Sequence, residues 1–192
     1  YTTGMPRPRD EDKRNAIMEA AIRVIAAQGL GAPTMKIAEE AGVANGSLFT
    51  YFETKADLFN QLYLELKSGM ASAALAGLPA KAELNKQMFH VWSNWMDWAM
   101  SNPERRRALA QLGVSDEITP ATRMAGNKVM TGIAELMQRV RVNGPMHNAP
   151  MPFVATIMNA LAEATMDFMI QDPANAKRHS KAGFEALWRA IA

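Results

Sequence analysis

The stretch TMKIAEEAGVANGSLFTYFETKADLF, residues Thr34 to Phe59, decides the fold of the N-terminal part of this 192-residue chain. Apolar residues at helical spacing predict a helix of about two turns that has Thr34 as its N-cap and stops at Gly42. A second short helix is expected from Asn45 to Phe52. Two short helices joined by a glycine-containing turn predict a helix-turn-helix, whose second helix can lie in the major groove of DNA.

The residue types within this stretch have physical reasons. Ala38 and Ala41 are small, which lets two helices cross closely, and Gly42 can take the positive φ of the turn. Lys55 opens the next helix, where its charge and the helix N-terminus would both meet the DNA backbone. The residues left pointing outward are short or polar and suited to base edges and phosphates, namely Asn45, Gly46, Ser47, Thr50 and Tyr51.

Two other interpretations of the same residues stay open. A pair of short helices also occurs as plain packing within a helical bundle. Asn45-Gly46 is in addition a typical type I′ hairpin turn. The residues on both sides of it have helical rather than alternating patterning, which favours the helix.

The order of residues here resembles the N-terminal domain of TetR-family transcriptional regulators. The resemblance is most specific over Ile17 to Leu62, and the remainder of the chain agrees in length and all-helical pattern. It implies an all-α protein with a three-helix helix-turn-helix DNA-binding domain at residues 5–53 and a larger helical ligand-binding and dimerisation domain at 54–192. The matching residues are Thr34, Ile37-Ala38, Ala41-Gly42-Val43, Gly46-Ser47-Leu48, Tyr51-Phe52 and Lys55.

We expect the DNA contacts to come from this same region. Ser47 and Thr50 are expected to contact bases, and Tyr51 and Lys55 to contact phosphates. The full expected set is Thr34, Lys36, Asn45, Gly46, Ser47, Thr50, Tyr51 and Lys55.

Two residues depart from the family pattern. Ala44 stands where many members have a serine before the recognition helix, so capping would pass to Asn45. Phe49 stands where a tyrosine commonly donates its hydroxyl to a phosphate. More narrowly, three later pieces resemble the RamR-type subgroup of enteric repressors that control drug efflux, namely Thr165 to Phe168 (TMDF), Asp172-Pro173 and Gly183 to Ala190.

The rest of the chain also has a helical period, without a convincing strand. Thr54 and Asp57 have capping-box spacing at the start of a helix. We expect nine helices in all, the later ones at Glu83 to Ser101, Pro103 to Leu112, Pro120 to Val142, Pro152 to Gln171 and Pro173 to Ile191.

Composition excludes several classes of site. The chain has no Cys, which removes disulfides and thiolate metal sites. His90, His147 and His179 lie in separate segments, so neither a metal nor a cofactor is expected. A Gly-rich phosphate loop, an HExxH motif and a nucleophile elbow are all missing from the sequence, so we do not expect an enzyme. No run of 18 apolar residues or signal-peptide pattern occurs, which predicts a cytoplasmic protein without a membrane partner.

Net charge gives little indication of a nucleic-acid partner. The whole chain carries +2, and Met5 to Lys67 holds eight basic residues against nine acidic ones. Cations that face DNA must therefore be placed locally. Arg7 and Arg9 are expected to form an arm that reaches the minor groove, with Lys13 and Arg14 nearby.

The larger half of the chain is expected to form a homodimer. One recognition helix reads few bases, so such domains usually bind double-stranded palindromic operators as two-fold dimers. The last two helices carry wide apolar stripes that would make a four-helix bundle with a second copy. The same stripes can instead face their own core. The expected interface residues are Phe153, Ile157, Leu161, Phe184, Leu187 and Trp188.

A small-molecule site is also predicted in the larger half. Three tryptophans recur every three residues on one helix, and indoles bind aromatic or cationic ligands by stacking and cation–π attraction. The helix from Pro152 to Gln171 adds a polar stripe. Ordinary core packing and a solvated helix face remain the alternatives. The expected ligand contacts are Trp92, Trp95, Met96, Trp98, Glu163, Asp167 and Phe168.

These features predict a ligand-responsive transcriptional repressor that a small hydrophobic or cationic aromatic effector releases from DNA. The effector would favour a conformation whose recognition helices no longer match successive major grooves. One alternative is a helix-turn-helix regulator that a partner protein controls without a small molecule. The other is an enzyme acting on a hydrophobic substrate, for which the sequence offers no evident nucleophile or cofactor motif.

Overall fold

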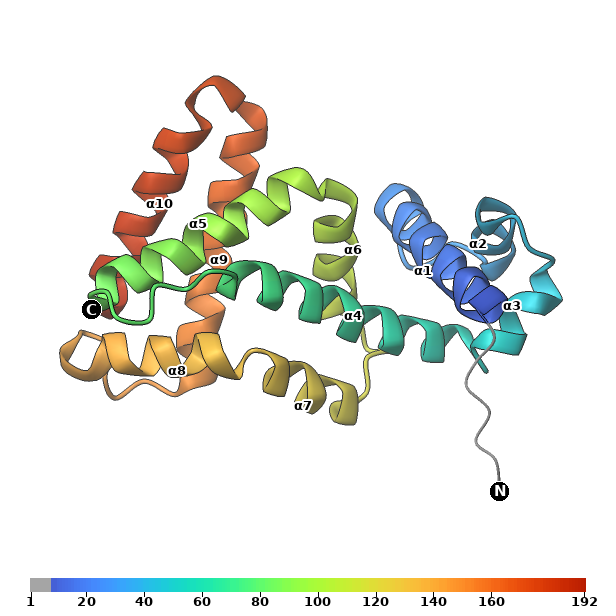
Figure 1. The fold of residues 1–192 in the computed structure, drawn as a ribbon, viewed down its shortest axis with the longest axis horizontal. Helices are drawn as coiled ribbons and strands as arrows, with labels where there is room; N and C mark the ends of the chain where they lie inside the picture. The colour runs from blue at the N-terminus through green and yellow to red at the C-terminus, as the bar shows by residue number, and fades with distance from the viewer. Residues whose placement is uncertain (1–7) are drawn as a thin grey trace. The chain divides into compact units, whose positions relative to one another are not determined.

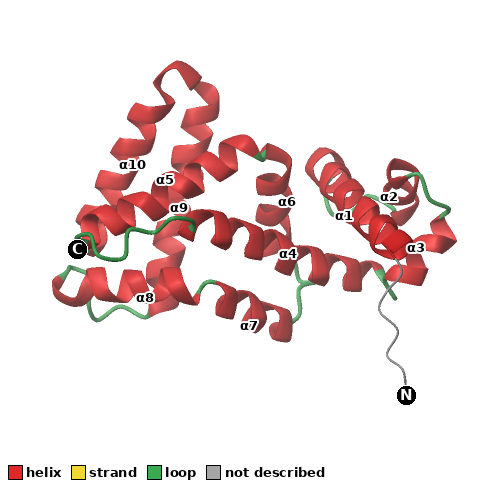
Figure 2. Ribbon diagram, in the orientation of Figure 1, coloured by secondary structure: helices red, strands yellow, loops and turns green. Residues whose placement is uncertain are grey.

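The computed structural model describes residues 8–192, which form ten α-helices and two short 3₁₀ helices (Figure 1). Over this described range Figure 2 shows helices and connecting loops, with no strand. The all-α fold class is therefore confirmed. The helices are α1 (Pro8–Gln28), α2 (Thr34–Ala41), α3 (Asn45–Tyr51), α4 (Lys55–Leu75), α5 (Leu84–Ser101), α6 (Pro103–Gly113), α7 (Pro120–Val129), α8 (Thr131–Val140), η1 (Arg141–Asn143), α9 (Met151–Gln171), η2 (Pro173–Asn175) and α10 (Ala176–Ile191).

The single helix predicted from Pro120 to Val142 is wrong, because two helices occupy most of that range. The break falls at Met130, whose backbone has φ −86° and ψ 2°. Its N–H donates to the carbonyl of Asn127 at 3.1 Å, which closes a tighter turn than an α-helix makes. Thr131 Oγ1 donates to the carbonyl of Lys128 at 2.7 Å and so satisfies a group freed by the break. No proline marks this position in the sequence.

The chain divides into two compact units. The N-terminal unit comprises the described residues up to Lys67 together with Pro103–Gly126, and the C-terminal unit comprises Ser68–Asn102 and Asn127–Ala192. Helix α4 contributes its first part to one unit and its end to the other. This division differs from the expected boundary at residue 54, since contacts within the fold group the start of α4 and all of α6 with the helix-turn-helix.

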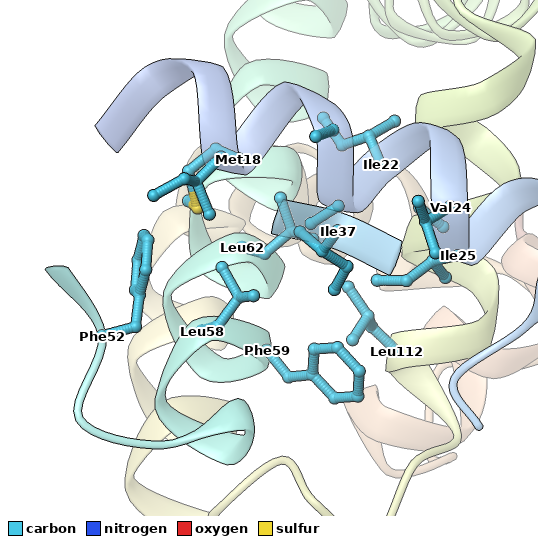
Figure 3. Close-up of a cluster of buried hydrophobic side chains, with 14 of the residues drawn as sticks. Met18, Ile22, Val24, Ile25, Ile37, Phe52, Leu58, Phe59, Leu62 and Leu112 are labelled. Atoms are coloured by element: carbon cyan, nitrogen blue, oxygen red, sulfur yellow. The ribbon is translucent and has the colours of Figure 1, made fainter. Parts of the chain in front are cut away.

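An apolar cluster joins α1, α2, α4 and α6 in the N-terminal unit (Figure 3). Each large aliphatic side chain removed from water here contributes about 1.5–3 kcal/mol. Gln111 of α6 donates its side-chain amide to the carbonyl of Ile25 in α1, at 3.1 Å. Packing against α6 is thus part of what holds α1 in place. The labelled members of the cluster are Met18, Ile22, Val24, Ile25, Ile37, Phe52, Leu58, Phe59, Leu62 and Leu112.

The start of α4 is capped as its sequence predicts. Thr54 Oγ1 accepts a hydrogen bond from the N–H of Asp57 at 3.0 Å. Asp57 Oδ2 in turn accepts from the N–H of Glu53 at 3.1 Å. Two backbone donors at the helix start are therefore satisfied by side chains.

Helices α9 and α10 form an antiparallel pair joined by a short turn in the C-terminal unit (Figure 1). Gly183 of α10 allows a close approach, because a Cβ there would lie 2.2 Å from Thr165 Oγ1 and 2.9 Å from the ring of Trp92. Trp92 of α5 donates its indole N–H to the carbonyl of Ser180 at 3.0 Å. This crossing of α5, α9 and α10 leaves no room for a larger residue.

Candidate nucleic-acid interface

The turn between α2 and α3 sets the angle at which α3 is presented. Gly42 has φ +68°, a left-handed conformation that side chains with a Cβ rarely adopt. Its N–H donates to the carbonyl of Glu39 at 3.1 Å, and the N–H of Val43 donates to the carbonyl of Ala38 at 3.0 Å. These two bonds close α2 with a reversal of the chain, and α3 begins three residues after Gly42.

The helix-turn-helix forms without the side-chain caps expected at its two helix starts. Thr34 is the first residue of α2 and not its N-cap, a position that Pro33 takes without a side-chain hydrogen bond. Ala44 is the N-cap of α3, so capping does not pass to Asn45. The free N–H groups at both helix starts remain available to solvent or to an anion.

Most of the residues that we predicted to read DNA lie on the outer side of α3. Asn45, Gly46 and Thr50 are exposed and Ser47 is half-buried, whereas Leu48 between them is fully buried. A Cβ added to Gly46 would meet nothing within 4 Å, so the surface beside it is open. The amphipathic pattern of α3 therefore anchors one side of a short helix and presents the polar side.

Two large apolar side chains of the helix-turn-helix are also exposed. Phe49 of α3 exposes 43% and Met35 of α2 exposes 53% of their surface. Thymine methyl groups in the major groove accept apolar contacts. Phe49 therefore offers an apolar contact at a position where a tyrosine would offer a hydroxyl.

Tyr51 lies at the end of α3 and is half-buried. Its hydroxyl donates to Asp10 Oδ1 of α1 at 3.4 Å. Partial desolvation, followed by the charge of Asp10 and this hydrogen bond, raises the pKa of Tyr51 above its ordinary value. The phenol therefore stays protonated at neutral pH and keeps a hydrogen to donate. Sequence reasoning missed Asp10 because the two residues are 41 positions apart.

The two predicted lysines are both engaged within the N-terminal unit. Lys55 Nζ donates to the carbonyl of Ala32 at 2.7 Å and lies 5.4 Å from the centre of the Phe59 ring. Lys36 Nζ pairs with Glu39 Oε2 at 2.9 Å and is exposed. A phosphate contact from Lys55 would replace an existing hydrogen bond, whereas Lys36 would give up only a surface ion pair.

The predicted arginine arm is described only in part. Arg7 and the side chain of Arg9 lie outside the described residues. Arg14 donates to Gln61 Oε1 at 2.9 Å and lies 3.7 Å from a carboxylate oxygen of Glu65. The Arg14 guanidinium is thus engaged by side chains of α4.

The predicted ligand residues differ widely in exposure. Trp92 exposes 1% of its surface, Met96 is equally buried, and the ring of Trp95 lies edge-on to Trp92 at 6.4 Å. By contrast, Phe168 of α9 exposes 57%. Trp98 and Glu163 are half-buried and Asp167 is exposed, and both carboxylates have an interaction partner.

The predicted dimer residues fall into two groups. Phe153 of α9 exposes 53% of its surface, while Ile157 and Leu161 one and two turns later are half-buried. On α10, Phe184 and Leu187 are buried within the chain and Trp188 is half-buried. Among the predicted dimer residues, the exposed apolar surface is therefore mainly that of α9.

Helix α9 also meets the length and composition criteria for crossing a membrane, with a mean hydropathy of 1.3 over a window of which 33% is buried. A core helix of a soluble protein passes the same test, so one such helix is weak evidence for a membrane span. Its apolar outer side is equally well suited to packing against protein.

Comparison with known proteins matches these features. Residues 17–62, which include the helix-turn-helix, match the model of the bacterial regulatory proteins of the tetR family. A solved tetR-family transcription regulator from Shewanella sp. PV-4 superimposes with a TM-score of 0.85 and 28% identity, covering 94% of this chain and 98% of that one.

Two further proteins are less similar. The nucleoid occlusion factor SlmA of Haemophilus influenzae (strain PittGG) is 25% identical over 162 residues, which cover 82% of this chain and 73% of SlmA. LfrR of Mycobacterium smegmatis, solved in complex with proflavine, has a TM-score of 0.69 at 19% identity, covering 94% and 98% of the two chains, and at that identity shows the fold alone. Residues 17–62 thus match the tetR family model, and the fold of the chain as a whole is similar to that of a solved tetR-family transcription regulator.

Proposed function

We propose that the protein is a sequence-specific repressor that binds a palindromic operator as a homodimer and leaves it when a small hydrophobic or cationic aromatic ligand binds the C-terminal unit. The observation that carries the proposal is α3, whose exposed residues are short and polar apart from Phe49, while Leu48 fixes its inner side. A helix with this pattern can enter the major groove without burying an unpaired charge.

The DNA contacts divide by chemistry. Ser47 and Thr50 carry hydroxyls that reach base edges, and Tyr51 has a neutral hydroxyl suited to a phosphate oxygen. Thr34, Lys36 and Lys55 would add backbone contacts, of which Lys36 is the more accessible. Asn45 and Gly46 at the start of α3 would lie against the DNA surface.

The exposed apolar surface of α9 supports the dimer. Phe153 and Phe168 lie toward opposite ends of this helix, and each exposes more than half of its surface. Burying such side chains against a second copy is favourable, and a two-fold arrangement places two recognition helices about 34 Å apart on one face of the duplex.

A cationic aromatic effector is supported by the aromatic content of the C-terminal unit. LfrR, which shares the fold, is solved with proflavine, a planar cationic aromatic molecule. Asp167 would balance the positive charge, and Trp98 and Phe168 have exposed ring surface for stacking. Trp92, Trp95 and Met96 are buried and would have to move to touch a ligand, and Glu163 is half-buried. The RamR-type resemblance remains a prediction of the same kind.

A second candidate function is a DNA-binding protein that responds to a partner protein and not to a small molecule. It is favoured by the relative SlmA, which is named for nucleoid occlusion and not for transcription. The two candidates differ in whether any small molecule changes DNA affinity.

The decisive test is a selection of bound sequences from random duplex DNA, followed by affinity measurements on the selected site and on a scrambled one. We expect tighter binding to a selected palindrome, and for Thr50→Ala a loss of about 1–3 kcal/mol of discrimination at one base pair in each half-site. Ser72→Ala, which removes an exposed hydroxyl of α4 outside all of the proposed sites, is the matched control. Equal affinity of the wild type for selected and scrambled DNA would refute sequence-specific binding.

A further inference from the structure

A surface pocket of about 440 Å³ lies between the start of α5 and α10, within the C-terminal unit. This volume is in the range of small-molecule sites, roughly 300–1,000 Å³. It shares no residue with the proposed DNA contacts or with the proposed effector contacts, whereas Phe184 and Trp188 are also among the predicted dimer residues. The pocket is lined by Asn85 and Phe89 of α5 and by Lys181, Phe184, Glu185, Trp188 and Arg189 of α10.

The wall of this pocket is aromatic. Phe89 exposes 41% of its surface, although its ring packs edge-on against Phe184 with the centroids 4.9 Å apart. Phe184 is followed by Trp188, with their centroids 6.1 Å apart. Three rings thus line one side, and the two outer ones keep accessible surface. A flat aromatic molecule would lie against the outer rings and cover apolar surface that the chain leaves in water.

The rim of the pocket carries net positive charge. Lys181 is exposed and has no ion-pair partner in the part of the chain that the structure describes. Glu185 is paired with Arg189, with Oε2 and Nη2 3.7 Å apart, and the Arg189 Nε also donates to the carbonyl of Glu185. The carboxylate in the lining is therefore offset by a neighbour on its own helix, whereas the Lys181 ammonium is not.

We propose that this pocket binds a small planar aromatic carboxylate, with its ring against Phe89 and Trp188 and its carboxylate at Lys181. The charge of the rim distinguishes this ligand from a cationic aromatic effector. A second copy of the chain is a less suitable occupant, because the large exposed apolar side chains Phe153 and Phe168 lie on α9 and not at this charged rim. Binding here does not depend on the proposed DNA-binding function.

Isothermal titration of the DNA-free protein with 2-naphthoate and with the uncharged 2-naphthamide tests the proposal. The two probes share their ring system, so their difference reports the charge alone. We expect 2-naphthoate to bind about two- to fivefold more tightly, as an exposed ion pair provides. Lys181→Gln should abolish this preference, and Lys177→Gln, an exposed lysine of α10 outside the pocket, should keep it.

A second variant examines the aromatic wall. Phe89→Ala should weaken both probes about tenfold while the melting temperature changes little, because this ring is already partly in water. The proposal is overturned if the wild type binds both probes equally, if the preference survives in Lys181→Gln, or if Phe89→Ala leaves both affinities unchanged. It is equally overturned if 2-naphthoate binds only after dilution to monomer, since a second copy would then fill the pocket.

Discussion

Helix α3 of the N-terminal unit and helix α9 of the C-terminal unit both present residues that the chain does not cover, and they present opposite chemistry. The exposed side of α3 carries Asn45, Gly46 and Thr50, which are polar or without a side chain, and Phe49 is its one large exposed apolar residue. The exposed side of α9 carries Phe153 and Phe168. Polar groups on a short anchored helix suit base edges and phosphates, whereas an apolar helix surface suits another protein surface.

The cores of the two units differ in the same sense. Only three of the 15 methionines precede residue 61. The N-terminal core consists largely of branched aliphatic and aromatic residues, whereas Met88, Met96, Met137, Met158, Met166 and Met169 are buried in the C-terminal unit. Methionine adapts its shape to its surroundings, so the second core is the better suited to rearrangement around a ligand.

The largest effect is expected from placing a charge on the outer side of α9. Phe153→Glu should raise the dimer dissociation constant by about 30-fold or more, because a buried aromatic anchor contributes about 2 kcal/mol or more to an interface. Ile170→Glu, also exposed on α9 but outside the predicted interface, is the control. Sedimentation equilibrium measures the dissociation constants of both variants. If Phe153→Glu dimerises like the wild type, the interface lies elsewhere.

The next effect concerns packing at the crossing of α5, α9 and α10. Gly183→Ala should lower the free energy of unfolding by about 1–3 kcal/mol, because the added methyl would overlap Thr165 Oγ1. Gly69→Ala in the middle of α4, where a Cβ meets nothing within 4 Å, should instead raise it by about 0.5–1 kcal/mol. Chemical denaturation measures the free energy of unfolding of both variants. Equal changes in the two variants would argue against a close crossing of the helices at Gly183.

A smaller effect separates the two lysines of the N-terminal unit. Lys55→Gln should lower the free energy of unfolding by about 1 kcal/mol through loss of its bond to the Ala32 carbonyl, and Lys36→Gln should change it by less than about 0.5 kcal/mol. If each lysine contacts a phosphate, each substitution should reduce the slope of log affinity against log salt concentration by about one, which corresponds to one released counterion fewer. An unchanged salt dependence in Lys55→Gln would leave that lysine a structural role only.

The smallest effect is a pH dependence at the turn before α10. Hydrogen bonds from His179 and then from Asn175 lower the pKa of Asp172 below its usual value. A depressed pKa adds stability above the unfolded value of about 3.9 and loses it as the pH falls through the lower folded value. Asp172→Asn should therefore melt slightly below the wild type near pH 7, and the gap should close in strong acid. A difference in melting temperature that persists in strong acid would show that it does not come from the charge of Asp172.

Local sequence signals anticipated the helices well where a side chain or glycine marks their ends. Gly42 and Thr54 end and begin helices as predicted, since a positive φ and a capping hydroxyl act within a few residues. The break at Met130 was missed because it depends on turn hydrogen bonds and not on a helix-breaking residue. Spacing alone also could not tell which members of an apolar stripe face their own core, as Phe184 and Phe153 show.

The sequence by itself determined the all-α class, the helix-turn-helix and the polar outer side of α3, because these follow from periodicity and turn chemistry within about 25 residues. Only the tertiary structure decided that Tyr51 meets Asp10, that Lys55 bonds to Ala32 and that Phe89 joins Trp188 around a pocket. Each of these pairs brings together residues from different elements. Such contacts depend on how the helices pack, which no local pattern specifies.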